Sequence, residues 1–227
     1  MSRSIEIELK FEVLDRAEVA RFVDHLEVIS EKRIVDVYLD TQEADLFKRS
    51  IFVRIRNNAT FDIKFNQEDF TKSLYDTVEH THCDEVSVQL PFTEGSITTV
   101  NETLKTLGLK PMTSPVLDEF MQRNNLVRSM IIDKERTSYD DGEFHIDRDT
   151  VDGLGEYLEI EKMTDEHADH DNISREMKEH LKGLQLKHVD VGYNELYWRK
   201  HNFDLYLQGK YLLIEDRKKY RPESLRG

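Results

Sequence analysis

Strict alternation of apolar and charged residues is the feature that most constrains the fold of this chain. It is clearest between residues 5 and 13, where apolar side chains at odd positions interleave with charged side chains at even positions. A period of two places successive side chains on opposite faces of a β-strand. Shorter alternating segments occur at 51–56, 61–65, 85–90 and 156–162. The sequence therefore predicts a sheet with one apolar face and one charged face.

Other segments complete a mixed set of strands and helices. Further strands are expected at about 28–38, 130–139 and 144–149, the last two forming a hairpin near Gly142. Apolar residues at helical spacing predict the remaining elements. The predicted helices span about 15–26, 100–107 and 173–184, and two others begin near residues 116 and 195. With about eight strands, mostly antiparallel, and at least four helices, the fold class is predicted to be α+β.

Composition favours one compact unit. The 227 residues lie within the usual range for a single domain. Hydrophobic residues make up 38% of the chain and include 11 Phe and 9 Tyr, which is sufficient for a core. Because there are only 4 Pro and 9 Gly, no flexible linker is expected to divide the sequence.

Charge and cysteine content exclude several functional classes. The 46 acidic residues against 32 basic residues give a net charge of −14, which opposes binding to a nucleic-acid backbone. A single cysteine excludes an intramolecular disulfide and fits a reducing cytoplasm. No apolar run approaches the ~20 residues needed to span a membrane, and the first residues lack an apolar signal core. A GxxxxGK[ST] phosphate-binding loop is also absent from the sequence.

Several predicted strands carry two like charges on one face. Such neighbours repel each other unless an opposite charge or a ligand lies between them. Taken singly, each pair is explained by a solvated strand face, but the repetition of the pattern points to a ligand. The pairs are Glu6 and Glu8, Arg54 and Arg56, and Glu159 and Glu161.

A sheet that closes into a barrel would collect these charged faces in its lumen. Burying so many ions without a ligand is costly, so a charged interior indicates a function. A polyanion complements the basic residues, and hard divalent cations complement the carboxylates and bridge to phosphate. The pattern therefore indicates a triphosphate–metal site. Its expected residues are Glu6, Glu8, Glu85, Glu159 and Glu161 with Lys10, Arg54, Arg56, Lys64 and Arg136.

The chain resembles the CYTH superfamily, also called the triphosphate tunnel metalloenzymes. The segment Glu6-Ile7-Glu8-Leu9-Lys10 matches the ExExK signature of that family. ExExK alone is a weak motif, but further landmarks follow in the family order over residues 5 to about 200. They are Tyr38-Leu39-Asp40, Arg54-Ile55-Arg56, Lys64, Glu85, Lys134-Glu135-Arg136, Asp147-Arg148-Asp149 and Glu159-Ile160-Glu161.

The resemblance implies an eight-stranded antiparallel β-barrel, the triphosphate tunnel, with flanking helices. It implies one tunnel domain over residues 1–205, followed by a tail at 206–227 that packs on or near it. It also implies that Mg²⁺ or Mn²⁺ is held by Glu6, Glu8, Glu159 and Glu161, with Asp149 or Asp147 assisting. Phosphate groups would bind Lys10, Arg54, Arg56, Lys64 and Arg136, with Glu85 also in the tunnel. Lys10, Glu8 and Arg56 are the expected catalytic residues.

Two departures from the family pattern concern cations. Members commonly carry a tunnel lysine before a tyrosine near the C-terminus, but here Val191 and Gly192 precede Tyr193. Lys187 lies nearby in sequence and is not assigned to the lumen. The basic tail either is solvated or folds back to supply a replacement cation. Its basic residues are Lys210, Arg217, Lys218, Lys219 and Arg221.

Arg136 is preferred over two other arginines for the strand before the hairpin. Arg128 lies upstream of the family spacing, and Arg123 falls in a predicted helix. A zinc site at His80, His82 and Cys83 is a weaker alternative, since a lone cysteine beside two histidines is a poor zinc motif.

The expected function is hydrolysis of a soluble triphosphate such as tripolyphosphate, thiamine triphosphate or a nucleoside triphosphate. An adenylyl cyclase of the same fold is the alternative, because the segment from Gly153 to Met163 resembles those cyclases; Glu159 and Glu161 together favour hydrolysis. A non-catalytic triphosphate sensor is a third possibility, and RNA 5′-triphosphatase activity is opposed by the acidic exterior. The expected partner is thus a small-molecule triphosphate, not nucleic acid or a membrane, for a cytoplasmic monomer or homodimer.

Overall fold

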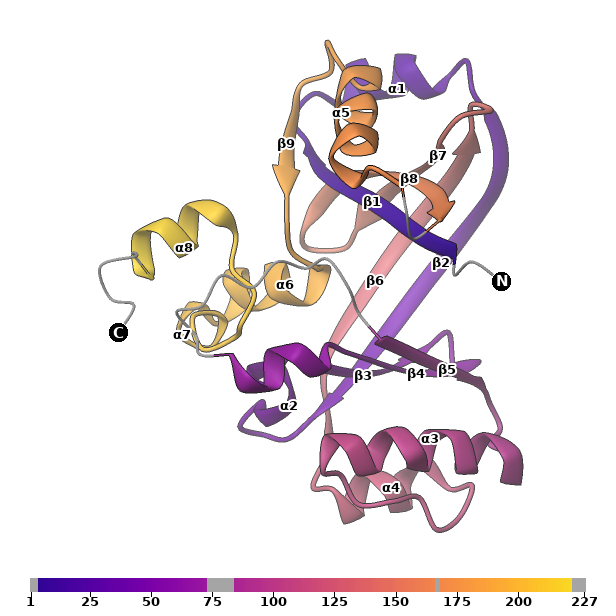
Figure 1. Cartoon of the computed structure of the whole chain (residues 1–227), viewed down its shortest axis with the longest axis vertical. Coiled ribbons are helices and arrows are strands. Elements are labelled where there is room, and N and C mark those ends of the chain that lie inside the picture. The colour runs from indigo at the N-terminus through magenta and orange to yellow at the C-terminus, as the bar shows by residue number, and fades with distance from the viewer. Residues whose placement is uncertain (1–3, 73–83, 166–167, 222–227) are drawn as a thin grey trace. The chain divides into compact units, whose positions relative to one another are not determined.

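The chain forms two compact units, each assembled from separate stretches of sequence. The computed structural model describes residues 4–72, 84–165 and 168–221 (Figure 1). The first unit comprises residues 1–34 and 133–190. The second comprises residues 35–132 and 191–227. Each unit therefore brings together segments that are distant in the sequence.

Nine strands form one sheet within the described ranges, in the order β5-β4-β3-β2-β6-β7-β8-β1-β9. Seven of the neighbouring pairs have an antiparallel register. The strands are β1 (Ser4–Val13), β2 (Glu27–Asp40), β3 (Ile51–Arg56), β4 (Thr60–Phe65), β5 (Asp84–Gln89), β6 (Val127–Asp140), β7 (His145–Val151), β8 (Gly155–Asp165) and β9 (Leu186–Val189).

This sheet confirms the predicted α+β class and the antiparallel strands with flanking helices. Two details differ from the prediction of a closed eight-stranded barrel. The described strands number nine, and they form an open order with β5 and β9 at its edges. The additional strand, β9, has four residues and pairs along the edge of β1. So short a segment offers too few positions for alternation to be recognised.

The helices agree with the sequence pattern where that pattern is long. The described helices are α1 (Arg16–Val23), α2 (Asp45–Lys48), α3 (Glu94–Leu107), α4 (Leu117–Arg123), α5 (His170–His180), α6 (Tyr193–His201), α7 (Phe203–Tyr206), α8 (Ile214–Tyr220) and the 3₁₀-helix η1 (Gln67–Thr71). Helix α3 begins at Glu94 rather than near Val100, because Thr93 and Ser96 form a reciprocal capping box before it. Within these ranges no helix has both the length and the apolar character to cross a membrane.

The core of the first unit lies between its strands and the helices α1 and α5 (Figure 1). Ile7 and Phe11 of β1 are buried there together with Ile146 of β7. Val19 of α1 and Met177 of α5 are fully buried against them. Because these apolar residues occupy one face of the strands, the charged residues between them project from the other face.

The core of the second unit joins β3 and β4 to helices α3 and α4 (Figure 1). Phe61 of β4 contacts the ring of Phe120 of α4 edge-to-face, with ring centroids 5.8 Å apart. The C-terminal segment belongs to this unit too, and Tyr211 lies beside Phe52 of β3 with ring centroids 6.5 Å apart. The described part of the tail therefore packs on the second unit, and the domain boundary after residue 205 stays a prediction.

Candidate functional site

Strand register aligns six polar side chains in two rows across β1, β8 and β7. The first row is Glu8, Glu161 and His145, and the second row is Lys10, Glu159 and Asp147. Side chains directly opposite each other on antiparallel strands have Cβ atoms about 5 Å apart. These residues therefore form one continuous cluster on the charged face of the first unit. Five of the six were predicted from the sequence, and His145 was not.

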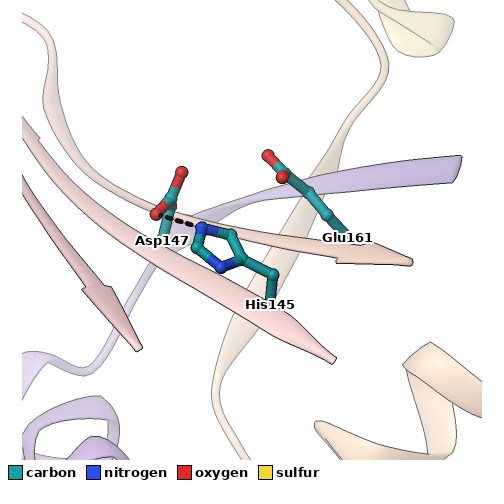
Figure 2. A group of neighbouring side chains, drawn as sticks. All are labelled: His145, Asp147 and Glu161. Carbon is teal, nitrogen blue, oxygen red and sulfur yellow. Dashed lines mark hydrogen bonds and ion pairs between the residues drawn. The ribbon is translucent and has the colours of Figure 1, made fainter. Parts of the chain in front are cut away.

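Three side chains of this cluster have the arrangement of a metal-binding group. One potential ligand atom from each of His145, Asp147 and Glu161 lies within 4.8 Å of the other two. Figure 2 shows the three side chains projecting from the same face of β7 and β8, with a hydrogen bond between the first two. This bond joins His145 Nε2 to Asp147 Oδ1 at 3.1 Å. An imidazole and two carboxylates form a donor set suited to a divalent ion.

Crowded carboxyl groups surround Glu161. Burial raises its pKa to about 9, and a hydrogen bond with Glu6 and the negative charges of Glu6, Glu8 and Asp147 contribute to the shift. The pKa of Glu8 is also raised, first by desolvation and then by Glu159 and Glu6, while Lys10 opposes the shift. The side chain of Glu8 still keeps 40% of its surface exposed. A bound cation would remove this repulsion, so the electrostatics of the cluster fit a metal ion.

Lys10 links the acidic group to a basic one. Its Nζ lies 3.0 Å from Glu159 Oε1 and 3.4 Å from Glu8 Oε1. Burial opposes the charge of Lys10, but the two carboxylates raise its pKa above the ordinary value. Burial also opposes the charge of Glu159, which would raise its pKa. The positive charges of Lys10, Arg136 and Lys134 nevertheless hold the pKa of Glu159 well below the usual range. Lys10 and Glu159 therefore form a fully charged pair at the centre of the cluster.

Arg136 and Lys134 extend the basic group along β6. Asp149 accepts hydrogen bonds from Arg136 Nε at 2.7 Å and Nη2 at 2.6 Å, and from Lys134 Nζ at 2.6 Å. Arg136 also pairs with Asp147 and Glu159. Lys134 was not among the predicted site residues, although it shares a strand face with Arg136. Burial lowers its pKa. The predicted metal-ligand role of Asp149 stays a prediction.

A second group of predicted residues lies on β3, β4 and β5 of the second unit. Arg54 is buried, and its Nε donates to Asp62 Oδ2 at 2.9 Å. Its Nη1 and Nη2 each lie 3.5 Å from a carboxylate, that of Asp36 and that of Glu85. Burial disfavours the charge of Arg54, but Tyr38, Asp36 and Asp62 keep its pKa above the ordinary value. Arg54 is therefore held rigidly as a cation.

Arg56 and Lys64 have acidic partners of their own. Arg56 makes a bidentate contact with Asp36, with distances of 2.7 and 2.9 Å. Lys64 Nζ lies 2.9 Å from Glu85 Oε2. Asp36 was not among the predicted site residues, although it alternates with apolar residues on β2. Asp36 lies opposite Arg56 because β2 pairs with β3, and the sequence does not specify this pairing.

The predicted site residues thus divide between the two units. Those of the first unit are Glu6, Glu8, Lys10, Arg136, Asp147, Asp149, Glu159 and Glu161, and those of the second are Arg54, Arg56, Lys64 and Glu85. Each set forms a connected cluster in its own unit. A single site containing both sets stays a prediction.

The segment that should carry the missing lysine holds a buried carboxylate. Val191 is buried, and Gly192 immediately precedes α6. Glu195 in the first turn of α6 is only 1% exposed, and a Cβ at Gly192 would lie 2.8 Å from its Oε2. Glu195 adds to the effect of burial in raising the pKa of Tyr38. Lys187, by contrast, lies exposed on β9 in the first unit.

Basic residues of the tail bind backbone carbonyl groups in the second unit. Lys210 Nζ donates to the carbonyl of Asp69 and, at 3.1 Å, to that of Lys72. Arg221 donates to the carbonyls of Gly209 at 2.6 Å and Lys210 at 3.3 Å. These bonds fold the tail onto its own unit. The role of the tail as a replacement for the tunnel lysine stays a prediction.

Two other candidate arginines belong to the second unit, and a weaker candidate site falls outside the described ranges. Arg123 lies in a helix, as predicted, and is the last residue of α4; it donates to Thr113 Oγ1 at 3.1 Å. Arg128 is an exposed residue of β6. The weaker zinc motif, at residues 80–83, falls outside the residues that the structure describes.

Comparison with known proteins identifies the family of the chain. Solved structures with a similar fold include the PH1819 protein of Pyrococcus horikoshii OT3 (TM-score 0.58, 21% identity, 86% of this chain and 99% of that one). Another is HpAC1 of Hippeastrum, an adenylyl cyclase candidate described as having a dominant triphosphatase activity (TM-score 0.54, 16% identity, 92% of this chain and 98% of that one). A third is an adenylate cyclase candidate of Bacillus halodurans (TM-score 0.51, 18% identity, 85% of this chain and 96% of that one). A search of curated proteins gave no significant match. The model of the CYTH domain matches residues 4–192, and the chain therefore belongs to the CYTH family.

Proposed function

We propose that this protein is a divalent-metal-dependent triphosphatase that hydrolyses a soluble triphosphate. CYTH proteins are typically metal-dependent enzymes, with triphosphatases and cyclases among them. The observation that carries the proposal is the cluster on β1, β8 and β7, where the row with Glu8 and Glu161 adjoins the row with the half-buried Lys10. An anion-binding site alone gains nothing from carboxylates that repel one another, whereas a metal–phosphate complex uses both rows.

The acidic residues have two different tasks in this proposal. Glu159 and Asp149 neutralise Lys10, Lys134 and Arg136, which they contact directly. Metal binding would fall to the residues whose carboxyl groups crowd one another, namely Glu6, Glu8, Asp147 and Glu161, although Glu8 and Asp147 also contact Lys10 and Arg136. Mg²⁺ or Mn²⁺, when bound, would neutralise phosphate charge and activate a water molecule.

The basic residues would bind and orient the triphosphate. Phosphoryl transfer requires little covalent chemistry from the protein and much stabilisation of negative charge. Lys10 and Arg136 carry fixed positive charge in the first unit, as do Arg54, Arg56 and Lys64 in the second. A carboxylate already holds each of these cationic side chains in place. The side chains therefore need to move little when phosphate oxygens approach.

The substrate proposed here is a small molecule such as tripolyphosphate, thiamine triphosphate or a nucleoside triphosphate. The net charge of −14 disfavours a long polyanion such as RNA. A cytoplasmic location is part of the proposal and is supported by the single cysteine.

An adenylyl cyclase is the second candidate. The segment from Gly153 to Met163 resembles those cyclases, and it forms most of β8, which carries Glu159 and Glu161. In a cyclase the 3′-hydroxyl of ATP attacks the α-phosphorus and pyrophosphate leaves. The presence of both glutamates on β8 favours hydrolysis instead.

A product analysis distinguishes these activities. The protein is incubated with tripolyphosphate, thiamine triphosphate and ATP in Mg²⁺ or Mn²⁺, and phosphate, pyrophosphate and cyclic AMP are separated. Orthophosphate without cyclic AMP is expected. Cyclic AMP with pyrophosphate would establish the cyclase instead. Binding of a triphosphate with no product from any substrate would identify a sensor.

A further inference from the structure

His145 belongs to the cluster of polar side chains on β1, β8 and β7, and phosphate binding does not explain its presence there. It is the first residue of β7, directly opposite Glu161 and two residues before Asp147. Its ring therefore projects from the same strand face as those two carboxylates (Figure 2). The side chain keeps 40% of its surface exposed, so the imidazole is accessible to a solute ion.

The distances in this group match the spacing of ligands around a divalent ion. Neighbouring ligands of an octahedral ion with bonds of about 2.1 Å lie about 3 Å apart. His145 Nε2 and Asp147 Oδ1 are 3.1 Å apart. All three potential ligand atoms lie within 4.8 Å of one another, so small side-chain adjustments bring Glu161 onto the same ion. An ion would replace the hydrogen bond between His145 and Asp147.

We infer that His145 is a nitrogen ligand of the metal site, together with Asp147 and Glu161, and that it makes the site prefer first-row transition ions over Mg²⁺. Mg²⁺ is a hard ion that binds oxygen ligands and keeps much of its water. Imidazole is a better ligand for transition ions, whose affinities rise from Mn²⁺ onward along the series. Mn²⁺ is the weakest binder of that series and therefore the most demanding probe. This inference rests on the metal-binding part of the proposed function, not on hydrolysis.

A simpler interpretation is that His145 only pairs with the buried carboxylate of Asp147. Such a pair does not involve a metal ion, so replacing His145 would then leave metal binding unaffected. The two interpretations therefore differ in the metal affinity and not in the fold.

The test measures metal binding without any triphosphate. Mn²⁺ binding to the full chain is followed by loss of the free-ion signal in electron paramagnetic resonance, and Mg²⁺ affinity by competition. Electron spin-echo modulation of bound Mn²⁺ reports whether a nitrogen atom is coordinated. The wild type is compared with His145→Gln, and with His25→Gln as a matched control at an exposed histidine outside the cluster.

His145→Gln is expected to weaken Mn²⁺ binding at least about tenfold, to change Mg²⁺ binding less than about threefold and to abolish the nitrogen modulation. His25→Gln should behave as the wild type. Bound Mn²⁺ without nitrogen modulation in the wild type would overturn the inference, as would modulation that persists in His145→Gln. Absence of triphosphate hydrolysis would contradict the proposed function alone, because none of these measurements requires turnover.

Discussion

The ionisation of Glu161 depends on its burial and on the neighbouring carboxylates. Its pKa is about 9 in the fold and 4.5 for an unperturbed glutamate, so the folded state holds its proton more tightly than the unfolded state. A raised pKa of this kind stabilises the fold fully below about pH 4.5, and that contribution is lost as the pH rises towards about 9. The free energy of unfolding of the metal-free protein should therefore decrease across this range.

Urea unfolding in EDTA, followed by circular dichroism at several pH values, checks this prediction. Glu161→Gln should flatten the decrease, because glutamine does not ionise. A parallel pH dependence in the two proteins would show that Glu161 ionises normally.

Glu8 and Arg56 provide a second test at the residue scale. If Glu8 holds metal and Arg56 holds phosphate, Glu8→Gln and Arg56→Ala should each reduce turnover by at least about 100-fold, the usual effect of removing one charge-stabilising group. Both side chains keep exposed surface, so the circular dichroism spectrum should not change.

Initial rates of phosphate release measure the effect. Glu102→Gln on α3 and Arg21→Ala on α1 are matched controls, because both positions are exposed and lie on helices away from the charged strand faces. Rates in Glu8→Gln and Arg56→Ala equal to those of the controls would remove these two residues from the site.

The capping box of α3 allows a test at the scale of one element. Thr93 Oγ1 accepts the N–H of Ser96 at 3.2 Å, and Ser96 Oγ accepts the N–H of Thr93 at 2.8 Å. Thr93→Ala should lower the free energy of unfolding by about 1 kcal/mol. The same substitution at Thr99 removes only a hydrogen bond to the carbonyl of Gly95 within the helix, so it should be neutral or slightly stabilising. Equal urea midpoints for the two variants would contradict the role of the cap.

Elements with a long hydrophobic pattern could be predicted from the sequence, and short ones could not. The alternation in β1, β3 and β4 was sufficient because one face of each strand packs in an apolar core and the other face carries charged side chains. The elements α2, α7 and β9 have four residues each, which is too few for a periodic pattern to be recognised. The start of α3 was missed because the capping signal lies before the apolar stripe.

The residues of the candidate site also divide into those that the sequence could predict and those that it could not. Residues at alternating positions, such as Glu8 and Glu161, could be assigned because strand geometry fixes their face. Asp36 also alternates with apolar residues, whereas Lys134 stands between two charged residues, and the roles of both depend on which strands are neighbours. Glu195 is buried by tertiary packing around the start of α6, and no local pattern indicates this.

At the scale of the whole molecule, the net charge of −14 conceals a segregation of charge. Acidic and basic groups are collected on particular strand faces, where Lys10, Arg54 and Arg136 are held close to carboxylates. The protein as a whole can therefore repel a long polyanion, although these clusters are suited to binding a short one.

The excess of carboxylates predicts that divalent ions stabilise the native state of the whole chain. An ion that binds only the native state at 100 times its dissociation constant contributes about 2.7 kcal/mol. For a chain of this size, that corresponds to an increase in melting temperature of about 5 °C or more. Thermal unfolding in Mn²⁺, compared with EDTA, measures the increase.

Glu8→Gln should lose most of this stabilisation, because it removes one carboxylate from the crowded acidic row, whereas Glu102→Gln should keep it. An ion that acted only by general screening of the −14 charge would stabilise both variants equally. A comparison at matched ionic strength, with Na⁺ in place of Mn²⁺, therefore separates a specific site from screening. Equal melting temperatures in the two salts for the wild-type protein would exclude a metal site in the native state.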